Sequence, residues 1–263
     1  MIERSAMRVR PNPKRPRALA LCLVVSVFAI LAPDTGRCTE HEDPYADARR
    51  KLVRTIEEHV RQTSAYLGKS ELDPRVIAAM ATVPRHEFVP ETLRGLAYAD
   101  KPLPIGNDQT ISQPYIVAIM TDLLDLPPNC KVLDIGTGSG YQAAVLAEIC
   151  ASVYGIEIVE PLGTQAAERL ARLGYDNVSV RIGDGFFGWP EEQPFDAIVV
   201  AAATDEVPAP LVEQLKPGGR MIIPLHKGFA YEQLVLVEKH ADQSITMREI
   251  LPVRFVPLTG DHD

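Results

Sequence analysis

The sequence predicts an α/β fold in which a doubly wound, mostly parallel sheet has helices on both faces. Two observations support this fold class. After Leu126, strand-like apolar runs alternate with helical patterns, and this alternation requires a parallel sheet because each helix crosses over between two strands. In addition, residues 131–140, KVLDIGTGSG, read as a strand followed by a glycine-rich turn that runs directly into a helix.

A helical layer is predicted N-terminal to the sheet. Apolar residues at helical spacing predict a helix over 47–67, and Asp73 opens a second helix. Residues 84–114 hold five prolines and no sustained periodicity, which predicts a long irregular segment of the kind that is often functional. A third helix begins after it, with Ser112 in its first turn.

The alternating region supplies the sheet and its covering helices. The predicted strands are 131–136, 152–157, 178–183, 195–202 and 220–225, and the predicted helices are 140–149, 160–173 and 208–215. Two further strands, 232–239 and 245–255, have no helix between them. We therefore expect them to pair antiparallel at one C-terminal edge of the sheet.

The glycine-rich turn indicates an adenosine-containing ligand rather than a dinucleotide. Its glycines, Gly136, Gly138 and Gly140, follow a G-x-G-x-G pattern instead of the G-x-G-x-x-G of pyrophosphate binders. Asp134 precedes the first glycine by two residues, where a carboxylate can meet a cationic group. Such a turn can also be only a tight packing corner. The acidic residues that follow decide between the two interpretations.

Acidic residues end the next two predicted strands. Glu157 lies about twenty residues beyond the turn, where a carboxylate suits the hydroxyls of a ribose. Asp184 and Gly185 end the third strand at the same edge of the sheet, within reach of an adenine. Nothing obvious provides for a diphosphate. The best chemical match is S-adenosylmethionine, which combines an adenosine with a sulfonium and an amino-acid tail.

Charge and composition argue against several other functions. The net charge is −8, and residues 39–263 alone carry twenty basic and thirty-three acidic residues, or −13. A nucleic-acid substrate is not expected, because phosphate neutralisation requires a basic face. The cysteines show no C-x-x-C spacing and the six histidines are scattered, so no metal site is expected. The G-x-S-x-G elbow of serine hydrolases is absent from the sequence.

The chain is predicted to consist of a signal-like leader, 1–38, and one domain, 39–263. Six basic residues among the first seventeen precede an uncharged segment of fifteen residues at 18–32, which is short for a membrane span and typical of a secretory signal. No A-x-A cleavage site is present, so an uncleaved anchor or a wrongly assigned start codon are alternatives. No stable membrane insertion is expected of the domain.

Three parts of the sequence resemble the protein-L-isoaspartate O-methyltransferase family, roughly over residues 50–260. These parts are VPRHEFVP with YADKPLPIGNDQTISQP, then VLDIGTGSGYQAAVLAEI, then LKPGGRMIIPL with VRFVPLTG. The LPIG-x-x-QTISQP segment is the specific one, since the other motifs occur in many methyltransferases. The resemblance implies a Rossmann-like enzyme that uses S-adenosylmethionine to methylate the free carboxylate of L-isoaspartyl residues in damaged proteins. The resulting ester collapses to a succinimide, which reopens partly to normal aspartate.

The resemblance also implies functional residues and divides the domain into N-terminal helices with a substrate loop, 45–126, and a cofactor-binding core, 127–263. Ser112 matches the residue conventionally called catalytic. The positions that match cofactor contacts or form the glycine turn are Gln109, Thr110, Ile111, Ser112, Tyr115, Asp134, Gly136, Gly138, Gly140, Glu157, Asp184, Gly185 and Thr259. Two departures from the family pattern are Asn107-Asp108, where His-Gly is more usual, and Ala201. Asp108 adds a carboxylate close to an anionic substrate, and its effect on substrate affinity stays open.

The chemistry of methyl transfer fits these residues. An isoaspartyl carboxylate is ionised at neutral pH, so the enzyme needs orientation and exclusion of water rather than a strong base. Ser112 suits a hydroxyl donor that fixes one carboxylate oxygen; its alternative role is that of a helix cap. Two alternative functions stay open: methylation of a small molecule, and a non-catalytic domain that binds an adenosyl ligand.

The resemblance implies isoaspartyl proteins and peptides as substrates, and we expect a monomer in the cytoplasm. The leader favours a periplasmic or envelope location as the alternative. Cys130 precedes the first strand and Cys150 ends the helix that returns beside it, so their side chains are expected to be neighbours. In the cytoplasm both should be free thiols, whereas an oxidising compartment would allow a disulfide.

Overall fold

A computed structural model of the chain describes residues 43–228 and 231–260. The predicted leader lies outside this range. From Asp43 onward the described residues form one compact unit. In this part of the chain, no helix is long and apolar enough to cross a membrane.

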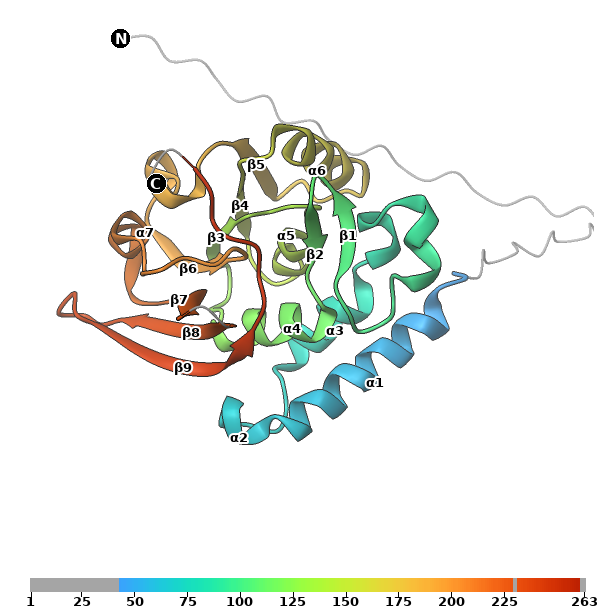
Figure 1. Ribbon diagram of the computed structural model, residues 1–263, viewed down its shortest axis with the longest axis horizontal. Helices are drawn as coiled ribbons and strands as arrows, with labels where there is room; N and C mark the ends of the chain where they lie inside the picture. Colours follow the sequence, from blue (N-terminus) through green and yellow to red (C-terminus); the bar gives the residue numbers. More distant parts are fainter. Residues whose placement is uncertain (1–42, 229–230, 261–263) are drawn as a thin grey trace, which may run out of the picture. The chain divides into compact units, whose positions relative to one another are not determined.

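A seven-stranded sheet, in the order β5-β4-β3-β6-β7-β8-β9, forms the centre of the fold (Figure 1). The neighbours from β5 to β7 are parallel, and β8 and β9 add antiparallel at one edge. The strands are β3 (Lys131–Ile135), β4 (Ser152–Glu157), β5 (Val178–Ile182), β6 (Phe195–Val200), β7 (Leu215–Lys227), β8 (Tyr231–Lys239) and β9 (Ile245–Val253). The predicted fold class is therefore confirmed. Strand order reverses between β3 and β6, which is where open α/β sheets bind ligands.

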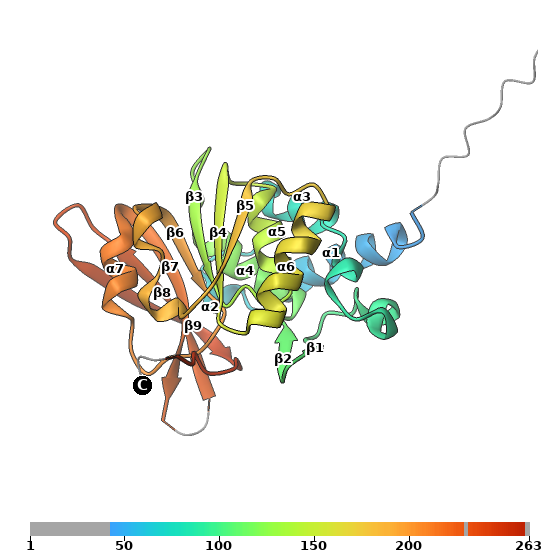
Figure 2. The ribbon, with the colours of Figure 1, turned by 90° about the horizontal axis from the view of Figure 1, so that it is seen from above.

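Helices cover both faces of the sheet, with α3 to α6 on one side and α7 on the other (Figure 2). The helices are α1 (Ala46–Gln62), α2 (Ser64–Leu67), α3 (Pro74–Thr82), α4 (Pro114–Leu123), α5 (Tyr141–Ala147), α6 (Glu160–Arg172) and α7 (Ala209–Gln214). The helix predicted over 47–67 is thus two helices with a break at Thr63. Asp73 opens α3 as predicted, because its side chain accepts a hydrogen bond from the Arg75 backbone N–H.

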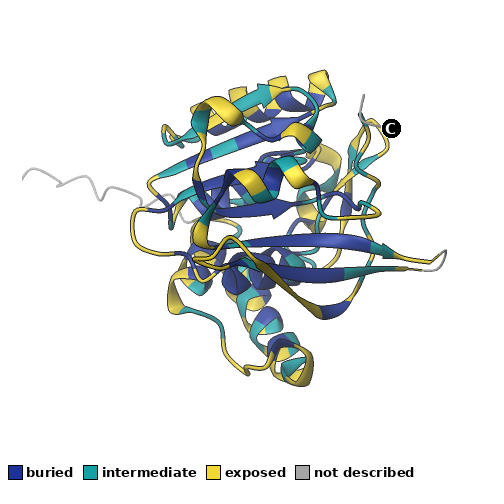
Figure 3. Ribbon diagram, turned by 90° about the vertical axis from the view of Figure 1, so that its left-hand side faces the viewer, coloured by how far each residue is buried: buried dark blue, intermediate teal, exposed yellow. Residues whose placement is uncertain are grey.

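The central strands are buried on both faces (Figure 3). In β3, Val132 packs into the core on the side of α4 and α5, whereas Leu133 and Ile135 pack into the core on the side of α7. Alternate side chains of one strand therefore serve two cores, which explains why the strand sequences are almost continuously apolar. Asp134 shares the face of Val132, so a carboxyl group enters an otherwise apolar layer.

The segment 84–114 is more ordered than the sequence predicts. It holds two short 3-10 helices, η1 (Arg85–Phe88) and η2 (Glu91–Leu96), and a hairpin of β1 (Leu103–Gly106) and β2 (Gln109–Ile111). Asn107 and Asp108 form the turn, with φ of 51° and 58°. Two successive positive φ angles are typical of a type I′ hairpin turn, which accepts Asn and Asp more readily than most residues. The Asn107-Asp108 departure from the family pattern therefore lies at an exposed hairpin tip.

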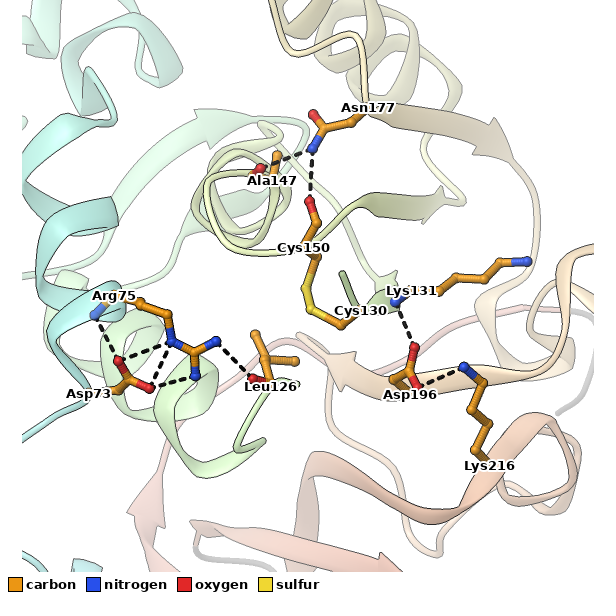
Figure 4. Close-up of a disulfide and its surroundings, with 10 residues drawn as sticks. All are labelled: Asp73, Arg75, Leu126, Cys130, Lys131, Ala147, Cys150, Asn177, Asp196 and Lys216. Atoms are coloured by element: carbon orange, nitrogen blue, oxygen red, sulfur yellow. Dashed lines mark hydrogen bonds and ion pairs between the residues drawn. A yellow bond between two sulfur atoms is a disulfide. The ribbon is translucent and has the colours of Figure 1, made fainter. Parts of the chain in front are cut away.

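A disulfide joins Cys130 and Cys150, whose Cα atoms are 4.6 Å apart (Figure 4). The turn after α5 brings Cys150 back beside the start of β3, and the Cys130 carbonyl accepts a hydrogen bond from the Ala151 N–H at 2.9 Å. The Asn177 side chain donates to the Cys150 carbonyl at 3.1 Å. The expected proximity of the two cysteines is confirmed. The structure differs from the expectation of free thiols in that a disulfide joins the two side chains; the redox state of the compartment decides whether this bond forms in the cell.

Reduction of this disulfide should destabilise the protein. The bridge closes a loop of 20 residues, for which the chain-entropy model gives about 3 kcal/mol. We expect chemical denaturation to show a lower unfolding midpoint for the reduced than for the oxidised protein. A Cys130→Ala/Cys150→Ala double variant is the control, and its midpoint should not respond to the reductant. Equal midpoints for the two forms of the natural protein would contradict a stabilising role.

Candidate cofactor and active site

A cavity lies at the carboxyl edge of the sheet, near the point where strand order reverses. Segments far apart in the sequence border it: the end of β2, one residue of α4, the glycine turn after β3, the end of β4, Gly185, the residues that follow β6, and the segment 256–259. Nine of the sequence-predicted positions line it, namely Gln109, Thr110, Ile111, Ser112, Gly136, Gly138, Glu157, Gly185 and Thr259. The structure therefore brings together residues from both the predicted substrate loop and the predicted cofactor core.

The glycine turn has two parts with different roles. Gly136 and Gly138 border the cavity with φ of 76° and 55°, a conformation that favours glycine. Gly140 also has a positive φ but lies outside the lining, at the start of α5. A Cβ added there would lie 3.1 Å from the Leu170 side chain. Gly140 is therefore a packing corner between α5 and α6, while the first two glycines shape the cavity wall.

Glu157 connects the glycine turn to the end of β4. Its Oε2 accepts a hydrogen bond from the Gly138 N–H at 2.7 Å, and its Oε1 accepts one from the Val159 N–H at 2.9 Å. The residue is only 5% exposed. Each carboxylate oxygen has a further lone pair, so the group can accept additional hydrogen bonds from a molecule in the cavity.

Asp134 lies in the interior rather than in the cavity lining. It is completely buried, and neither carboxyl oxygen has a hydrogen-bond partner among the described residues. Burial raises the pKa of Asp134 to about 7; the nearby Thr137 hydroxyl lowers this pKa and the Glu157 charge raises it. An ionised carboxylate in such a place is costly unless a cation compensates it. Near neutral pH this group is therefore poised between its neutral and its charged form.

Two more predicted positions lie away from the lining. Tyr115 is buried in α4, and its hydroxyl hydrogen bonds to the Thr63 hydroxyl at 2.6 Å, on the side of α1. The Asp184 carboxylate accepts a hydrogen bond from the Phe186 N–H at 2.9 Å, so Asp184 caps the short helix η3 (Gly185–Phe187). Asp184 thereby positions Gly185, which does line the cavity.

Ser112 lies between β2 and α4, where two cavities meet. The second cavity shares Thr110, Ser112, Ala201 and Val256 with the first and continues along 252–255. Arg254 is the only charged residue that lines this second groove. Ser112 therefore borders both cavities, and a group transfer requires two bound molecules that meet at such a junction.

The expected alternative role of Ser112 as a helix cap is not what the structure shows. The residue that precedes α4 is Gln113, and the Gln113 side chain makes no capping hydrogen bond. Instead, Asp100 accepts a hydrogen bond from the Tyr115 N–H at 2.8 Å. Asp100 thus serves as the cap from a distant segment.

Several cavity residues were not found from the sequence. They are polar or small residues of the turns and apolar residues beside them: Thr137, Ser139, Gln142, Ile158, Val159 and Ala202. Ile158 is 39% exposed although it directly follows an apolar strand. Its sequence context is that of a core residue, so no local signal marks it as part of a binding surface.

Comparisons with known proteins agree on one family. The family model for protein-L-isoaspartate(D-aspartate) O-methyltransferase matches residues 62–263. A Syntrophobacter fumaroxidans protein named protein-L-isoaspartate O-methyltransferase 2 is 62% identical over 240 residues, covering 91% of this chain and 96% of the relative. A Cupriavidus necator protein named protein-L-isoaspartate O-methyltransferase 1 is 52% identical over 251 residues, covering 95% and 96%.

Solved structures give the same result. A protein-L-isoaspartate O-methyltransferase is similar with a TM-score of 0.70 and 30% identity, over 81% of this chain and 66% of that one. A Plasmodium falciparum protein described as a candidate member of the family, in complex with S-adenosyl-L-homocysteine, is similar with a TM-score of 0.67 and 25% identity, over 81% and 99%. The chain belongs to the protein-L-isoaspartate(D-aspartate) O-methyltransferase family.

Proposed function

We propose that this protein transfers the methyl group of S-adenosylmethionine to the free carboxylate of L-isoaspartyl residues in damaged proteins and peptides. The observation that carries the proposal is the junction of two cavities at Ser112, one with the glycine turn and one open along 252–255. The names of the relatives support the same substrate and reaction. The methyl ester then collapses to a succinimide, which starts the repair.

The residues of the first cavity fit S-adenosylmethionine. Gly136 and Gly138 leave the backbone accessible, and the Glu157 carboxylate can accept hydrogen bonds from ribose hydroxyls. Beneath this wall, the buried and unpartnered Asp134 carboxyl would be compensated by a positively charged ligand group. The complex of the Plasmodium relative with S-adenosyl-L-homocysteine, the demethylated cofactor, also supports this choice.

The chain's own residues supply orientation rather than acid–base chemistry. When bound, the cofactor supplies a methyl carbon made electrophilic by the sulfonium. An isoaspartyl carboxylate has a pKa of about 4 and needs no base at neutral pH. The Ser112 hydroxyl can donate a hydrogen bond to one carboxylate oxygen and leave the other to attack. The walls of the two cavities exclude water and hold the reactants in place.

We also propose that the protein acts as a monomer in an oxidising compartment of the cell envelope. The supply of S-adenosylmethionine favours the cytoplasm, as expected from the resemblance. The Cys130–Cys150 disulfide favours the envelope instead, because cytoplasmic thiols are kept reduced.

An isoaspartyl peptide and labelled cofactor test the reaction. The natural protein should transfer label to this peptide and not to its normal aspartyl counterpart. Ser112→Ala should lower the turnover number about 10-fold to 100-fold, the scale of a hydrogen bond to a charged group. Ser179→Ala, an exposed serine in β5, is the matched control and should retain turnover. Cofactor binding without any transfer would refute the proposed reaction and favour a non-catalytic domain or a different substrate.

The pKa of Asp134 predicts how cofactor affinity depends on pH. Below pH 7 the buried carboxyl is protonated in the free protein, and a cationic ligand favours its ionised form, so binding releases a proton. The dissociation constant of S-adenosylmethionine, measured without a peptide substrate, should therefore fall as pH rises from about 5.5 to 7, by up to about tenfold per unit, and then level off. Asp134→Asn should flatten this profile, whereas exposed Asp176→Asn should not. An unchanged profile in Asp134→Asn, measured by calorimetry, refutes the assignment.

The compartment is tested on protein taken directly from its native cells under acid quench. If the protein works in the envelope, it should appear in the periplasmic or membrane fraction with a cross-linked peptide joining Cys130 and Cys150 in the mass spectrum. A cytoplasmic fraction with two free thiols would instead establish the cytoplasm as the site of action.

A further inference from the structure

The main chain at Ser112 is held by a buried arginine. Arg85, at the start of η1, is 0% exposed. Its Nη2 donates a hydrogen bond to the Ser112 carbonyl at 2.8 Å, and its Nε donates one to the Ala97 carbonyl at 2.9 Å. The guanidinium carbon also lies 4.6 Å from the centre of the Tyr141 ring, which borders the cofactor cavity. One side chain thus connects the end of η2, the carbonyl of Ser112 two residues before α4, and the cavity wall.

Burial of this guanidinium is costly unless its donors are satisfied. Burial lowers the pKa of Arg85, which shows that desolvation outweighs the attraction of neighbouring groups. The side chain nevertheless has no carboxylate partner at salt-bridge distance in the described part of the chain. Nε and Nη2 donate to backbone carbonyls, whereas Nη1 has no hydrogen-bond partner among the described residues. Hydrogen bonds to carbonyls fix the path of a loop rather than a charge. The arrangement therefore specifies the position of the Ser112 backbone.

An aspartate holds the same turn from the other side. The Asp100 side chain is 5% exposed and lies against the start of α4. Its Oδ1 accepts a hydrogen bond from the Tyr115 N–H at 2.8 Å, and its Oδ2 accepts one from the Gln113 side chain at 3.0 Å. The His59 Nδ1 lies 2.6 Å from Oδ2, so α1 supports the carboxylate from behind.

We propose that Arg85 and Asp100 are positioning residues for Ser112. Arg85 holds the carbonyl of Ser112. Asp100 holds the side chain of Gln113, the next residue, and the backbone N–H of Tyr115 at the start of α4. With both contacts in place, the hydroxyl of Ser112 stays at the junction of the two cavities. This inference rests on the proposed function of Ser112. It assigns a catalytic effect to the N-terminal helical layer, although neither Arg85 nor Asp100 lines either cavity.

Asp100→Asn tests the proposal with nearly unchanged shape. Asn can still accept one hydrogen bond but loses the charge that faces Tyr115 and His59. We expect the turnover number with an isoaspartyl peptide to fall about 10-fold to 100-fold, the effect of a small misplacement. The dissociation constant of S-adenosyl-L-homocysteine should change less than about twofold, since the glycine turn and Glu157 are untouched.

Asp73→Asn is the matched control. Asp73 caps α3 as Asp100 caps α4, since its Oδ1 accepts a hydrogen bond from the Arg75 N–H at 2.8 Å. It has no contact with Ser112 among the interactions of the described residues. Both variants lose a charged cap, but only Asp100→Asn should lose turnover. If both variants lose turnover equally, the effect is one of general stability and the proposal is overturned.

A double variant shows whether Asp100 acts through Ser112. In Ser112→Ala the hydroxyl is gone, so adding Asp100→Asn should lower turnover by less than about twofold more. If the loss of turnover in the double variant equals the product of the losses in the two single variants, Asp100 does not act through Ser112. Arg85→Lys keeps the positive charge but cannot reach two carbonyls with a planar fork, and it should show the same pattern as Asp100→Asn.

Hydrogen exchange tests the positioning without any assay of methyl transfer. Amides of residues 109–117 should exchange faster in Asp100→Asn than in the natural protein, while Asp73→Asn should leave this segment unchanged. Unchanged protection in Asp100→Asn overturns the proposal even if the enzyme is active. Faster exchange in a protein without isoaspartyl activity would support the positioning of this turn and refute only the proposed function.

Discussion

The contact between the Glu157 carboxylate and the backbone of the glycine turn holds the cofactor cavity together. Glu157 ends β4 and the glycine turn follows β3, so the hydrogen bond from the Gly138 N–H fixes two neighbouring strand ends relative to each other. The parallel order of the strands makes this possible, since all their carboxyl ends meet at one edge. The Gly138 conformation and the cavity wall both depend on that shared edge.

The N-terminal layer adds a second cavity wall that contains Ser112. The edge of the sheet alone does not provide this wall. A glycine turn can bind an adenosyl group, but it offers no group that orients a second substrate. The hairpin of β1 and β2 brings Ser112 over the edge, and contacts from Arg85 and Asp100 keep it there. Under the proposed function, binding of the cofactor and orientation of the acceptor belong to two parts of one domain that meet at Ser112.

The sequence predicts the sheet well because buried parallel strands are both apolar and evenly spaced. It misses the hairpin 103–111, since strands of three and four residues with Pro104 among them have no detectable period. The site is predicted at the level of segments. Tyr115, Asp134 and Asp184 do not line the cavity, because the directions of their side chains depend on helices and loops distant in sequence. Gly140 instead lies where α5 packs against α6. Motif positions therefore place a residue at the right edge without showing whether it faces the cavity or supports it.

Asp134 shows how such a supporting residue can still serve binding. A buried carboxyl without a partner lowers the stability of the free protein wherever it must ionise, because its pKa is raised above that of the unfolded chain. The cost is greatest above pH 7 and vanishes well below it. Under the proposed function, a positively charged group of the ligand on the other side of the cavity wall would offset the same cost. The buried carboxyl would then favour a cationic adenosyl ligand over a neutral one, which a glycine turn alone would not distinguish.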